Sequence, residues 1–389
     1  MKLTSLDYLE LSDHFSDEEI MVHLSAREFI QKEIQPDIED YFEKGEFPIH
    51  LVRKFGDLGF LGINLPEKYG CADMSYLAYG LLNQELERCD SGIRSFISVQ
   101  GSLVMYPIYT FGSEEQKSRW LPQLASGRAI GCFGLTEPDC GSNPGEMITH
   151  AKKTDDGYIL NGVKMWITNG SIADLAVVWA KTEDNIIRGF LVEKEFGGFS
   201  TMDVKRKWSL RASNTSELIL EDVFVPEESV LPNIEGMKGP LKCLTQARYS
   251  IGWGTIGAAM ALYEASVKYA KERIQFGKPI ASFQLTQEKL VWMLTEITKG
   301  QLLAIQVGKN NNAGRLRHQQ ISMLKMNNTK VARECAKLAR EIHGANGISG
   351  EYPIMRHLMN IESVYTYEGT HEMHTLILGK DITGIDSIQ

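Results

Sequence analysis

Apolar and polar residues recur at helical spacing over the first third of the chain. Ser16 and Ser113 each stand three residues before a Glu or Gln, the spacing of a capping box at a helix start. Amphipathic stretches cover residues 20–29, 76–88, 99–109 and 114–124. The pattern predicts an N-terminal α-helical domain over residues 1–129.

The period changes near residue 130. Short runs rich in β-branched and aromatic residues follow, at 158–160, 163–168, 175–179 and 218–220. Gly and Asn turns separate them, among them Asp155-Asp156-Gly157 and Asn161-Gly162. This middle segment, residues 130–234, is predicted to form an antiparallel β-barrel or sandwich.

After Pro226 and Pro232 the helical period returns in three long stretches. They are Ile251–Arg273, Leu285–Asn310 and Ile321–His343. Helices of this length bury their apolar stripes against one another, so residues 235–389 are predicted to form a four-helix bundle. The elements follow one another as a block of helices, a block of strands and a second block of helices. This order, without repeated strand–helix alternation, indicates an α+β fold rather than a doubly wound sheet.

Composition narrows the class of protein. The chain has 389 residues, 43% hydrophobic and 23% charged, which is typical of a folded globular protein. Its net charge of −9 argues against a nucleic-acid partner, and the best basic cluster, Lys205-Arg206-Lys207-Trp208, is short. We interpret that short cluster as a solvated strand end.

The cysteines and the N-terminal residues indicate the cellular compartment in which the protein is expected. Six cysteines lack a Cys-x-x-Cys pair or a histidine at zinc spacing, so we expect reduced thiols and no metal site. Met1–Asp7 has no apolar run, and no stretch approaches the ~18 apolar residues of a membrane span. We expect a soluble cytoplasmic protein, or one of the mitochondrial matrix if a targeting peptide has been removed.

Two motifs resemble known binding signatures but lack their context. Gly252, Gly254 and Gly257 satisfy G-x-G-x-x-G, yet they lie inside a helical pattern with no preceding strand, so we expect close helix packing rather than a dinucleotide site. His371 and His374 are three residues apart, whereas the zinc motif H-E-x-x-H needs four.

Near the C-terminus, Tyr367-Glu368-Gly369-Thr370 places a carboxylate between an aromatic ring and a glycine. Neighbours that exclude water raise the pKa of a Glu towards neutrality, which suits it to remove a weakly acidic proton. Glu368 is therefore the candidate catalytic base, although a solvated turn is the commoner context for such a tripeptide.

Together with this segment, Gly134-Leu135-Thr136-Glu137-Pro138 and Trp166-Ile167-Thr168-Asn169 resemble the acyl-CoA dehydrogenase family. The likeness runs from about Glu19 to Ile385, and within the family it is greatest to the glutaryl-CoA dehydrogenases. The α–β–α layout expected from this resemblance agrees with the pattern of the chain.

The resemblance implies FAD as cofactor and assigns its contacts. Trp166 covers the ring, Thr168 directs its hydroxyl at the flavin, and Thr136 faces the pyrimidine side. The other implied contacts are Phe133, Leu135, Ser142, Ile167, Thr370 and Glu372. Contacts that reach a neighbouring subunit's flavin are Arg273, Phe276, Gln284, Gly344 and Ala345, the last standing where the family usually has glycine. The resemblance thereby implies a homo-oligomer, usually a tetramer.

The same resemblance implies the substrate contacts. Arg94 occupies the place that binds the distal carboxylate of glutaryl-CoA, and a guanidinium fork suits that planar anion. Further implied contacts are Glu87, Ser95, Ser142, Arg248 and Tyr367. Polar Glu87 and Tyr367 favour decarboxylation to crotonyl-CoA and CO₂, with electrons passing to an electron-transferring flavoprotein. The alternatives are a non-decarboxylating glutaryl-CoA dehydrogenase, another short-chain acyl-CoA dehydrogenase or oxidase, and a flavoprotein that has lost catalysis.

Overall fold

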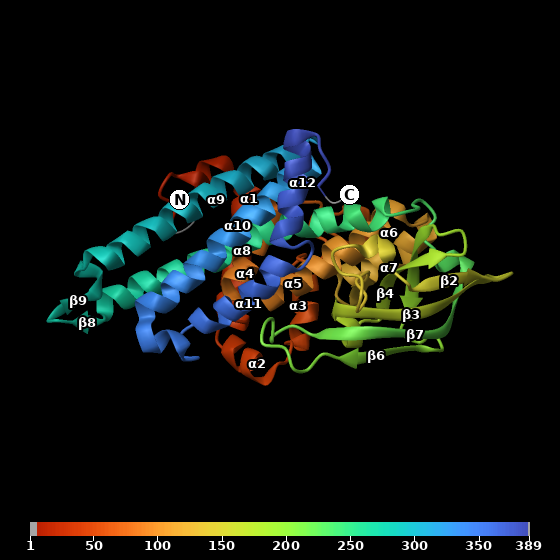
Figure 1. The fold of residues 1–389 in the computed structure, drawn as a ribbon, viewed down its shortest axis with the longest axis horizontal. Coiled ribbons are helices and arrows are strands. Elements are labelled where there is room, and N and C mark those ends of the chain that lie inside the picture. Colours follow the sequence, from red (N-terminus) through yellow and green to blue (C-terminus); the bar gives the residue numbers. More distant parts are fainter. Residues whose placement is uncertain (1–5, 388–389) are drawn as a thin grey trace.

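The computed structural model describes residues 6–387. Most of the segment considered for a targeting signal, Met1–Ser5, lies outside the described residues. An N-terminal group of helices and a C-terminal group pack together, and a β-sheet lies at one end of the molecule (Figure 1). The order helices, strands, helices confirms the α+β class. The predicted boundaries at 129/130 and 234/235 fall in connections, between a helix that ends at Ala125 and a strand that begins at Gly131, and before a long helix that begins at Lys238.

The N-terminal helices begin where the capping patterns predict. The capping boxes at Ser16 and Ser113 are both formed, each with its side-chain and backbone bonds. The α-helices are α1 (Asp17–Glu33), α2 (Ile38–Lys44), α3 (Val52–Asp57), α4 (Tyr76–Cys89), α5 (Ser91–Ser98), α6 (Tyr106–Phe111) and α7 (Glu114–Ala125), with η4 (Val99–Met105) joining α5 to α6.

The middle segment forms one seven-stranded sheet in the order β1-β4-β2-β3-β7-β6, with β5 paired to β4. Its strands are β1 (Gly131–Gly134), β2 (His150–Lys153), β3 (Gly157–Thr168), β4 (Leu175–Thr182), β5 (Ile187–Glu193), β6 (Phe199–Asp203) and β7 (Thr215–Pro226). The pairs β1·β4 and β2·β4 are parallel, where the sequence predicts antiparallel pairing throughout. Alternation along a strand reports which face is buried and carries no information on a partner's direction.

The turn predicted at Asn161-Gly162 is not a turn. β3 runs through it and pairs with β7 on both sides, with a register shift between Leu160 and Gly162. Gly162 has a φ of 146°, and a Cβ there would lie 2.4 Å from Thr149 Oγ1. Glycine thus permits an irregularity within a continuous strand.

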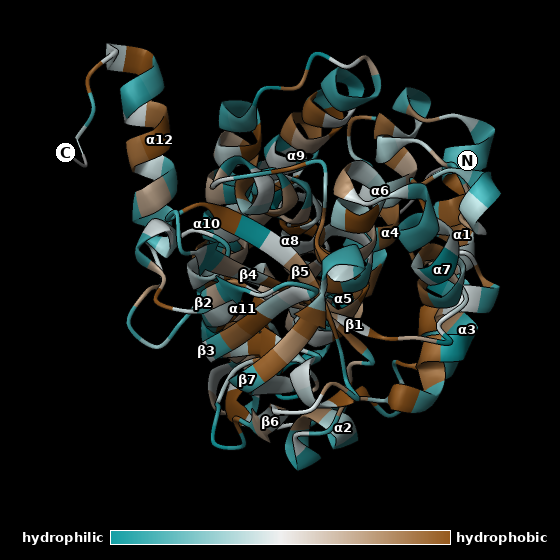
Figure 2. Cartoon of the chain, turned by 90° about the vertical axis from the view of Figure 1, so that its right-hand side faces the viewer, coloured by the Kyte–Doolittle hydropathy of each residue, from teal (hydrophilic) through white to brown (hydrophobic). Residues whose placement is uncertain are grey.

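The C-terminal segment contains α8 (Lys238–Glu272), α9 (Gln284–Asn312), α10 (His318–His343), α11 (Ile354–Thr366) and α12 (His371–Thr383). A small hairpin, β8 (Ile274–Gln275) and β9 (Lys278–Pro279), joins α8 to α9. The three long helices agree with the prediction, and α8 starts earlier than its pattern indicates. The pattern gave no separate α11 or α12, and α12 projects from the body of the molecule (Figure 2).

The glycine motif lies inside α8 and serves helix packing, as predicted. A Cβ on Gly257 would lie 1.8 Å from the carbonyl oxygen of Gln84 on α4, and one on Gly254 would lie 2.1 Å from Glu87 Oε2. On Gly252 it would lie 2.4 Å from Leu324 on α10. Close approach of α4 and α10 to α8 therefore depends on these three positions.

The cysteines are free thiols, and five of the six are buried. Among residues 6–387, no helix has the length and apolar character of a membrane span. The same residues hold no cluster of three or more His, Cys, Asp or Glu side chains able to ligate a metal.

Candidate active site

A cavity of about 1410 Å³ lies where the β-sheet meets the helices. Its wall includes strand residues, the start of α8, the start of α10 and the connection between α11 and α12. Twelve of the residues singled out from the sequence line it: Ser95, Phe133, Leu135, Thr136, Ser142, Trp166, Ile167, Thr168, Arg248, Tyr367, Glu368 and Thr370. The fold thus brings the three sequence motifs to one cavity.

On the strand side, Trp166 lies in an irregular part of β3. The β3·β7 register shifts between Lys164 and Ile167, and Trp166 has a φ of 63°. Such a bulge re-aims a side chain, and the indole is 58% exposed on the cavity wall. Met165 N–H donates to the carbonyl of Thr136 (2.8 Å), which places the segment after β1 beside the bulge.

A buried ion pair supports this wall from behind. The ammonium of Lys164 donates to Glu137 Oε1 (2.8 Å) and to the carbonyl oxygen of Leu135 (3.1 Å). Glu137 also accepts from the backbone N–H groups of Ile148 and Thr149. Burial lowers the pKa of Lys164 to about 8, although Glu137 opposes that shift. The pair fixes the segment that presents Leu135 and Thr136 to the cavity.

On the helix side, Glu368 lies in the short connection between α11 and α12. Its φ is 53°, and the following Gly369 has a φ of 98°. The carboxylate oxygen Oε2 is enclosed and has no hydrogen-bond partner among the described residues. Burial raises the pKa of Glu368, while the cations of Arg94, Lys325 and Arg248 act against that increase. An unpartnered carboxylate with a raised pKa on a cavity wall is suited to accept a proton.

The backbone around Glu368 is held by two cations. Lys325 Nζ, from α10, donates to the carbonyl oxygens of Tyr367 (2.7 Å) and Gly369 (2.5 Å). Arg248 Nε, from α8, donates to the carbonyl oxygen of Glu368 (2.6 Å). Thr370 caps α12 by accepting from the N–H of Met373 (3.2 Å).

Arg94 is fully buried behind the cavity wall. Its Nε donates to Glu87 Oε2 at 2.7 Å, and its Nη2 donates to the hydroxyl of Tyr367. Nη1 has no partner in the part of the chain that the structure describes. Burial raises the pKa of Glu87 against the effect of Arg94. Arg94 itself does not line the cavity, but its neighbours Ser95 and Tyr367 do.

Five predicted cofactor contacts lie far from this cavity. Arg273, Phe276, Gln284, Gly344 and Ala345 are exposed at the opposite end of the helical bundle, at the β8–β9 hairpin and the end of α10 (Figure 1). Arg248 lines the cavity and Arg273 follows the end of α8, so at 1.5 Å per residue about 35 Å of helix separates them. Glu372 is exposed at the start of α12 and does not line the cavity either.

Several cavity residues were not anticipated. Lys207 and Trp208 line it, so the cluster interpreted as a solvated strand end contributes to the site. Lys207 Nζ donates to the carbonyl oxygen of Ser213 (2.8 Å), and burial lowers its pKa to about 8. Lys238 and Lys242, at the start of α8, also line the cavity. A lysine within a helical pattern carries no local signal of such a position.

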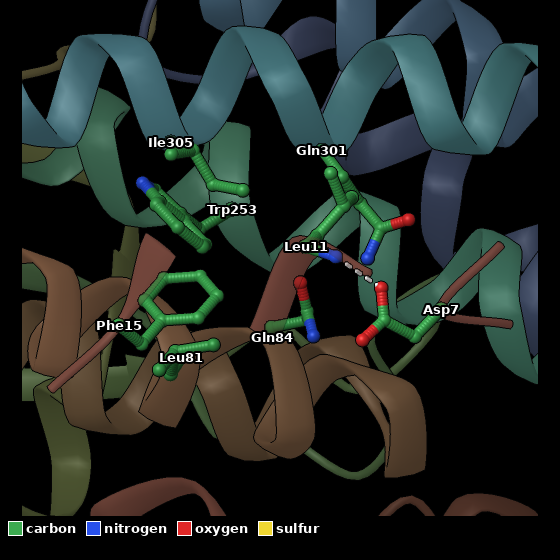
Figure 3. Close-up of a pocket in the computed structure, with 8 residues that line it drawn as sticks. All are labelled: Asp7, Leu11, Phe15, Leu81, Gln84, Trp253, Gln301 and Ile305. Carbon is green, nitrogen blue, oxygen red and sulfur yellow. Dashed lines mark hydrogen bonds between the residues drawn. The ribbon is translucent and has the colours of Figure 1, made fainter. Parts of the chain in front are cut away.

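A second cavity, of about 10 Å³, is lined by residues of α4, α8, α9 and the N-terminal segment, among them Leu81, Trp253 and Gln301 (Figure 3). This volume is about that of one water molecule. It therefore offers no room for an organic ligand.

Family models match nearly the whole chain. They describe the acyl-CoA dehydrogenase N-terminal domain over residues 16–128, the middle domain over 132–223 and the C-terminal domain over 235–383. A curated relative, the glutaryl-CoA dehydrogenase of Desulfococcus multivorans, is 34% identical over 382 residues, covering 96% of this chain and 98% of the relative.

Two solved structures are closely similar. The crystal structure of glutaryl-CoA dehydrogenase from Mycobacterium smegmatis has a TM-score of 0.97 and 51% identity, over 99% of both chains. A crystal structure of a glutaryl-CoA dehydrogenase from the same organism in complex with FADH2 has a TM-score of 0.97 and 48% identity, again over 99% of both chains.

Proposed function

Because the chain belongs to the acyl-CoA dehydrogenase family, we propose that it oxidises glutaryl-CoA and releases crotonyl-CoA and CO₂. The observation that carries this proposal is Glu368, whose carboxylate faces a large cavity with one oxygen enclosed and unpartnered. Similarity to glutaryl-CoA dehydrogenases and the buried Glu87–Arg94–Tyr367 group support the choice of substrate.

FAD is the cofactor of this family, and a similar structure holds its reduced form. The residues of this chain fit it: the cavity has one aromatic wall at Trp166, hydroxyl groups at Thr136 and Thr168, and apolar Phe133 and Leu135. When bound, the flavin accepts the hydride that leaves the β-carbon of the thioester. We assign these strand residues as the groups that hold it.

Glu368 acts first as the base. It removes a proton from the α-carbon, and its raised pKa narrows the gap between the acidity of that carbon and its own. The negative charge that develops on the thioester oxygen needs donors, each contributing about 3 kcal/mol in comparable sites. We assign the backbone N–H of Glu368 as one such donor.

Arg94 sets the preference for a dicarboxylic chain. Its free Nη1 donors suit a carboxylate at the far end of the acyl group, since charge-assisted bonds from a guanidinium to a carboxylate are strong. A monocarboxylic chain leaves those donors unmatched in a site that excludes water. We place the distal carboxylate near Arg94, Ser95 and Tyr367.

Decarboxylation follows from the product of the first step. Once the α,β double bond exists, loss of CO₂ from the γ-carbon leaves a dienolate, which is stabilised by the same donors at the thioester oxygen. Glu368, protonated by the first step, returns that proton to the γ-carbon and yields crotonyl-CoA. We propose an electron-transferring flavoprotein as the final acceptor of the electrons.

The distant contacts imply assembly of two or more copies. Arg273, Phe276 and Gln284 are exposed about 35 Å along α8 from the cavity, so we propose that they serve the flavin of a second copy. The hairpin and the first turns of α9 also carry exposed apolar side chains, at Ile274, Leu285 and Val291, which another copy would cover.

Anaerobic titration tests the proposal. Holoenzyme is mixed with glutaryl-CoA or butyryl-CoA while flavin absorbance is followed, and glutaryl-CoA labelled at C5 is then turned over with an electron acceptor. We expect bleaching with glutaryl-CoA in preference to butyryl-CoA, and labelled CO₂ equal to the substrate consumed. Glutaconyl-CoA without labelled CO₂ would identify a non-decarboxylating enzyme. Failure of glutaryl-CoA to bleach the flavin would refute the substrate assignment.

A further inference from the structure

The connection that carries Glu368 is held by contacts outside itself. α11 ends at Thr366 and α12 begins at His371; Tyr367 and Thr370 still make one helical backbone bond each, but Glu368 and Gly369 make none. Three consecutive carbonyl groups, of Tyr367, Glu368 and Gly369, all accept from cationic side chains of α10 and α8. Lys325 alone takes two of the three.

Lys325 is an unusual buried side chain. It is 0% exposed, and within the described residues its ammonium donates only to backbone carbonyls, while its charge also acts on the nearby Glu368 carboxylate and opposes the increase in that group's pKa. A buried ammonium without a paired carboxylate is costly, and here its donors go to the backbone on both sides of one residue. The bonds of Lys325 therefore restrain the backbone conformation of the connection between α11 and α12.

Holding the carbonyl of Tyr367 also orients the N–H of Glu368. The described residues contain no cis peptide bond, and in a trans peptide the C=O and the following N–H point in opposite directions. Because the Tyr367 carbonyl points to Lys325, the Glu368 N–H points away from it. That N–H has no acceptor among the described residues, and Glu368 lies on the cavity wall.

We propose that Lys325 is a positioning residue for proton abstraction. Its ammonium fixes the peptide plane before Glu368 and the peptide plane after Gly369, supports the left-handed backbone at Glu368, and so aims both the carboxylate and the N–H at the thioester. Arg248 completes the restraint at the middle carbonyl. The inference rests on the function proposed above, in which Glu368 is the base.

The test compares Lys325→Met with Asn328→Leu. Asn328 lies one turn further along α10, is also fully buried, and donates to the carbonyl oxygens of Gly252 (2.7 Å) and Gly300 (3.2 Å). Each variant therefore removes two buried bonds from the same helix to backbone carbonyls, but only the first touches the connection. FAD content and melting temperature are measured for both.

The readout is formation of an enolate without oxidation. Acetoacetyl-CoA loses its α-proton with no hydride transfer, so the fraction bound as enolate is read from ultraviolet absorbance across pH. For Lys325→Met we expect the enolate to be about ten-fold less favoured and flavin reduction by acyl-CoA about 100-fold slower, with KM changed less than about three-fold. Asn328→Leu should match the wild type in all three.

The outcomes distinguish failure of the role proposed for Lys325 from failure of the proposed function. Equal behaviour of the two variants, with an active wild type, overturns the role of Lys325 alone. A wild-type holoenzyme that neither forms the enolate nor bleaches with any acyl-CoA overturns the proposed function and this inference together. If Lys325→Met does not fold, Lys325→Gln is compared with the wild type instead, and unchanged enolate formation overturns the inference.

Discussion

At the scale of single residues, the proposed chemistry depends on where Glu368 lies. The sequence identified it from its neighbours, and the structure places it on the cavity wall with a raised pKa. The reason for the increase was not readable from the segment, because the charged groups that face Glu368 come from four helices: Glu87, Arg94, Arg248 and Lys325. Burial, together with the negative charge of Glu87, outweighs the three cations and raises the pKa of Glu368.

This balance predicts the pH dependence of flavin reduction. A base works only when deprotonated, and the pKa of Glu368 is raised above its ordinary value of 4.5. The rate should therefore fall as pH decreases through a value higher than that of a free glutamate. Single-turnover bleaching over a pH series measures it. An acid limb at or below the ordinary value would contradict the role of burial.

Glu368→Gln tests the base directly. Glutamine keeps the size and polarity of the side chain but cannot accept a proton, so flavin reduction should slow by at least about 10⁴-fold. Bound FAD and the affinity for glutaryl-CoA should remain, as judged by absorbance and equilibrium titration. Rapid reduction in this variant would mean that another group is the base.

Arg94 requires a paired substitution. Removing it alone leaves Glu87 as an unpaired buried carboxylate, at a cost of about 3–5 kcal/mol. The double variant Arg94→Met with Glu87→Gln removes both charges. We expect it to lose at least about ten-fold in kcat/KM for glutaryl-CoA relative to butyryl-CoA. An equal loss with both substrates would show that Arg94 does not recognise the distal carboxylate.

At the scale of elements, helix starts were predictable and sheet details were not. Ser16 and Ser113 cap α1 and α7 because a capping box is written in four consecutive residues. The bulge at Trp166 and the parallel pairing of β1 with β4 depend on partners 44 or more residues away in the chain. The same limit hid the contacts of Lys325 with two backbone carbonyls and of Lys164 with Glu137 and Leu135, because these partners lie far away in the sequence.

The glycines of α8 offer a test at this scale. Gly257→Ala would place a methyl group 1.8 Å from the Gln84 carbonyl oxygen, so α4 and α8 would have to separate. We expect destabilisation of about 1–3 kcal/mol, seen as a lower melting temperature. Gly379→Ala, in α12 with nothing near its Cβ, is the matched control and should not lower it. Equal melting temperatures would contradict close packing at Gly257.

At the scale of the whole molecule, one chain contains the cavity but not all of the predicted flavin contacts. Phe276 is 92% exposed on the hairpin at the far end of α8, whereas Trp166 lines the cavity. The sequence cannot distinguish a contact within one chain from a contact between two, because both appear as residues of the same sequence. The length of α8 favours a contact between two copies, since about 35 Å of helix separates the hairpin from Arg248 in the cavity wall.

This separation predicts complementation between defective copies. Phe276→Asp should disrupt the contact that one copy makes with its neighbour's flavin. Trp166→Ala should disrupt the wall of the variant's own cavity. Each variant alone should therefore retain little FAD. In a mixed dimer, the Phe276→Asp copy keeps an intact wall and receives an intact hairpin. Random mixing should then restore about a quarter of the wild-type flavin sites, because half the dimers are mixed and each has one complete site.

Co-expression of the two variants, followed by measurement of bound FAD and acyl-CoA-dependent bleaching, provides the readout. Each variant expressed alone is the control for residual binding. If Phe276 instead contacted the flavin of its own chain, every copy in the mixture would carry one defect and co-expression would restore nothing. Recovery therefore requires that the hairpin of one copy completes the cavity of another, which makes the oligomer the functional unit.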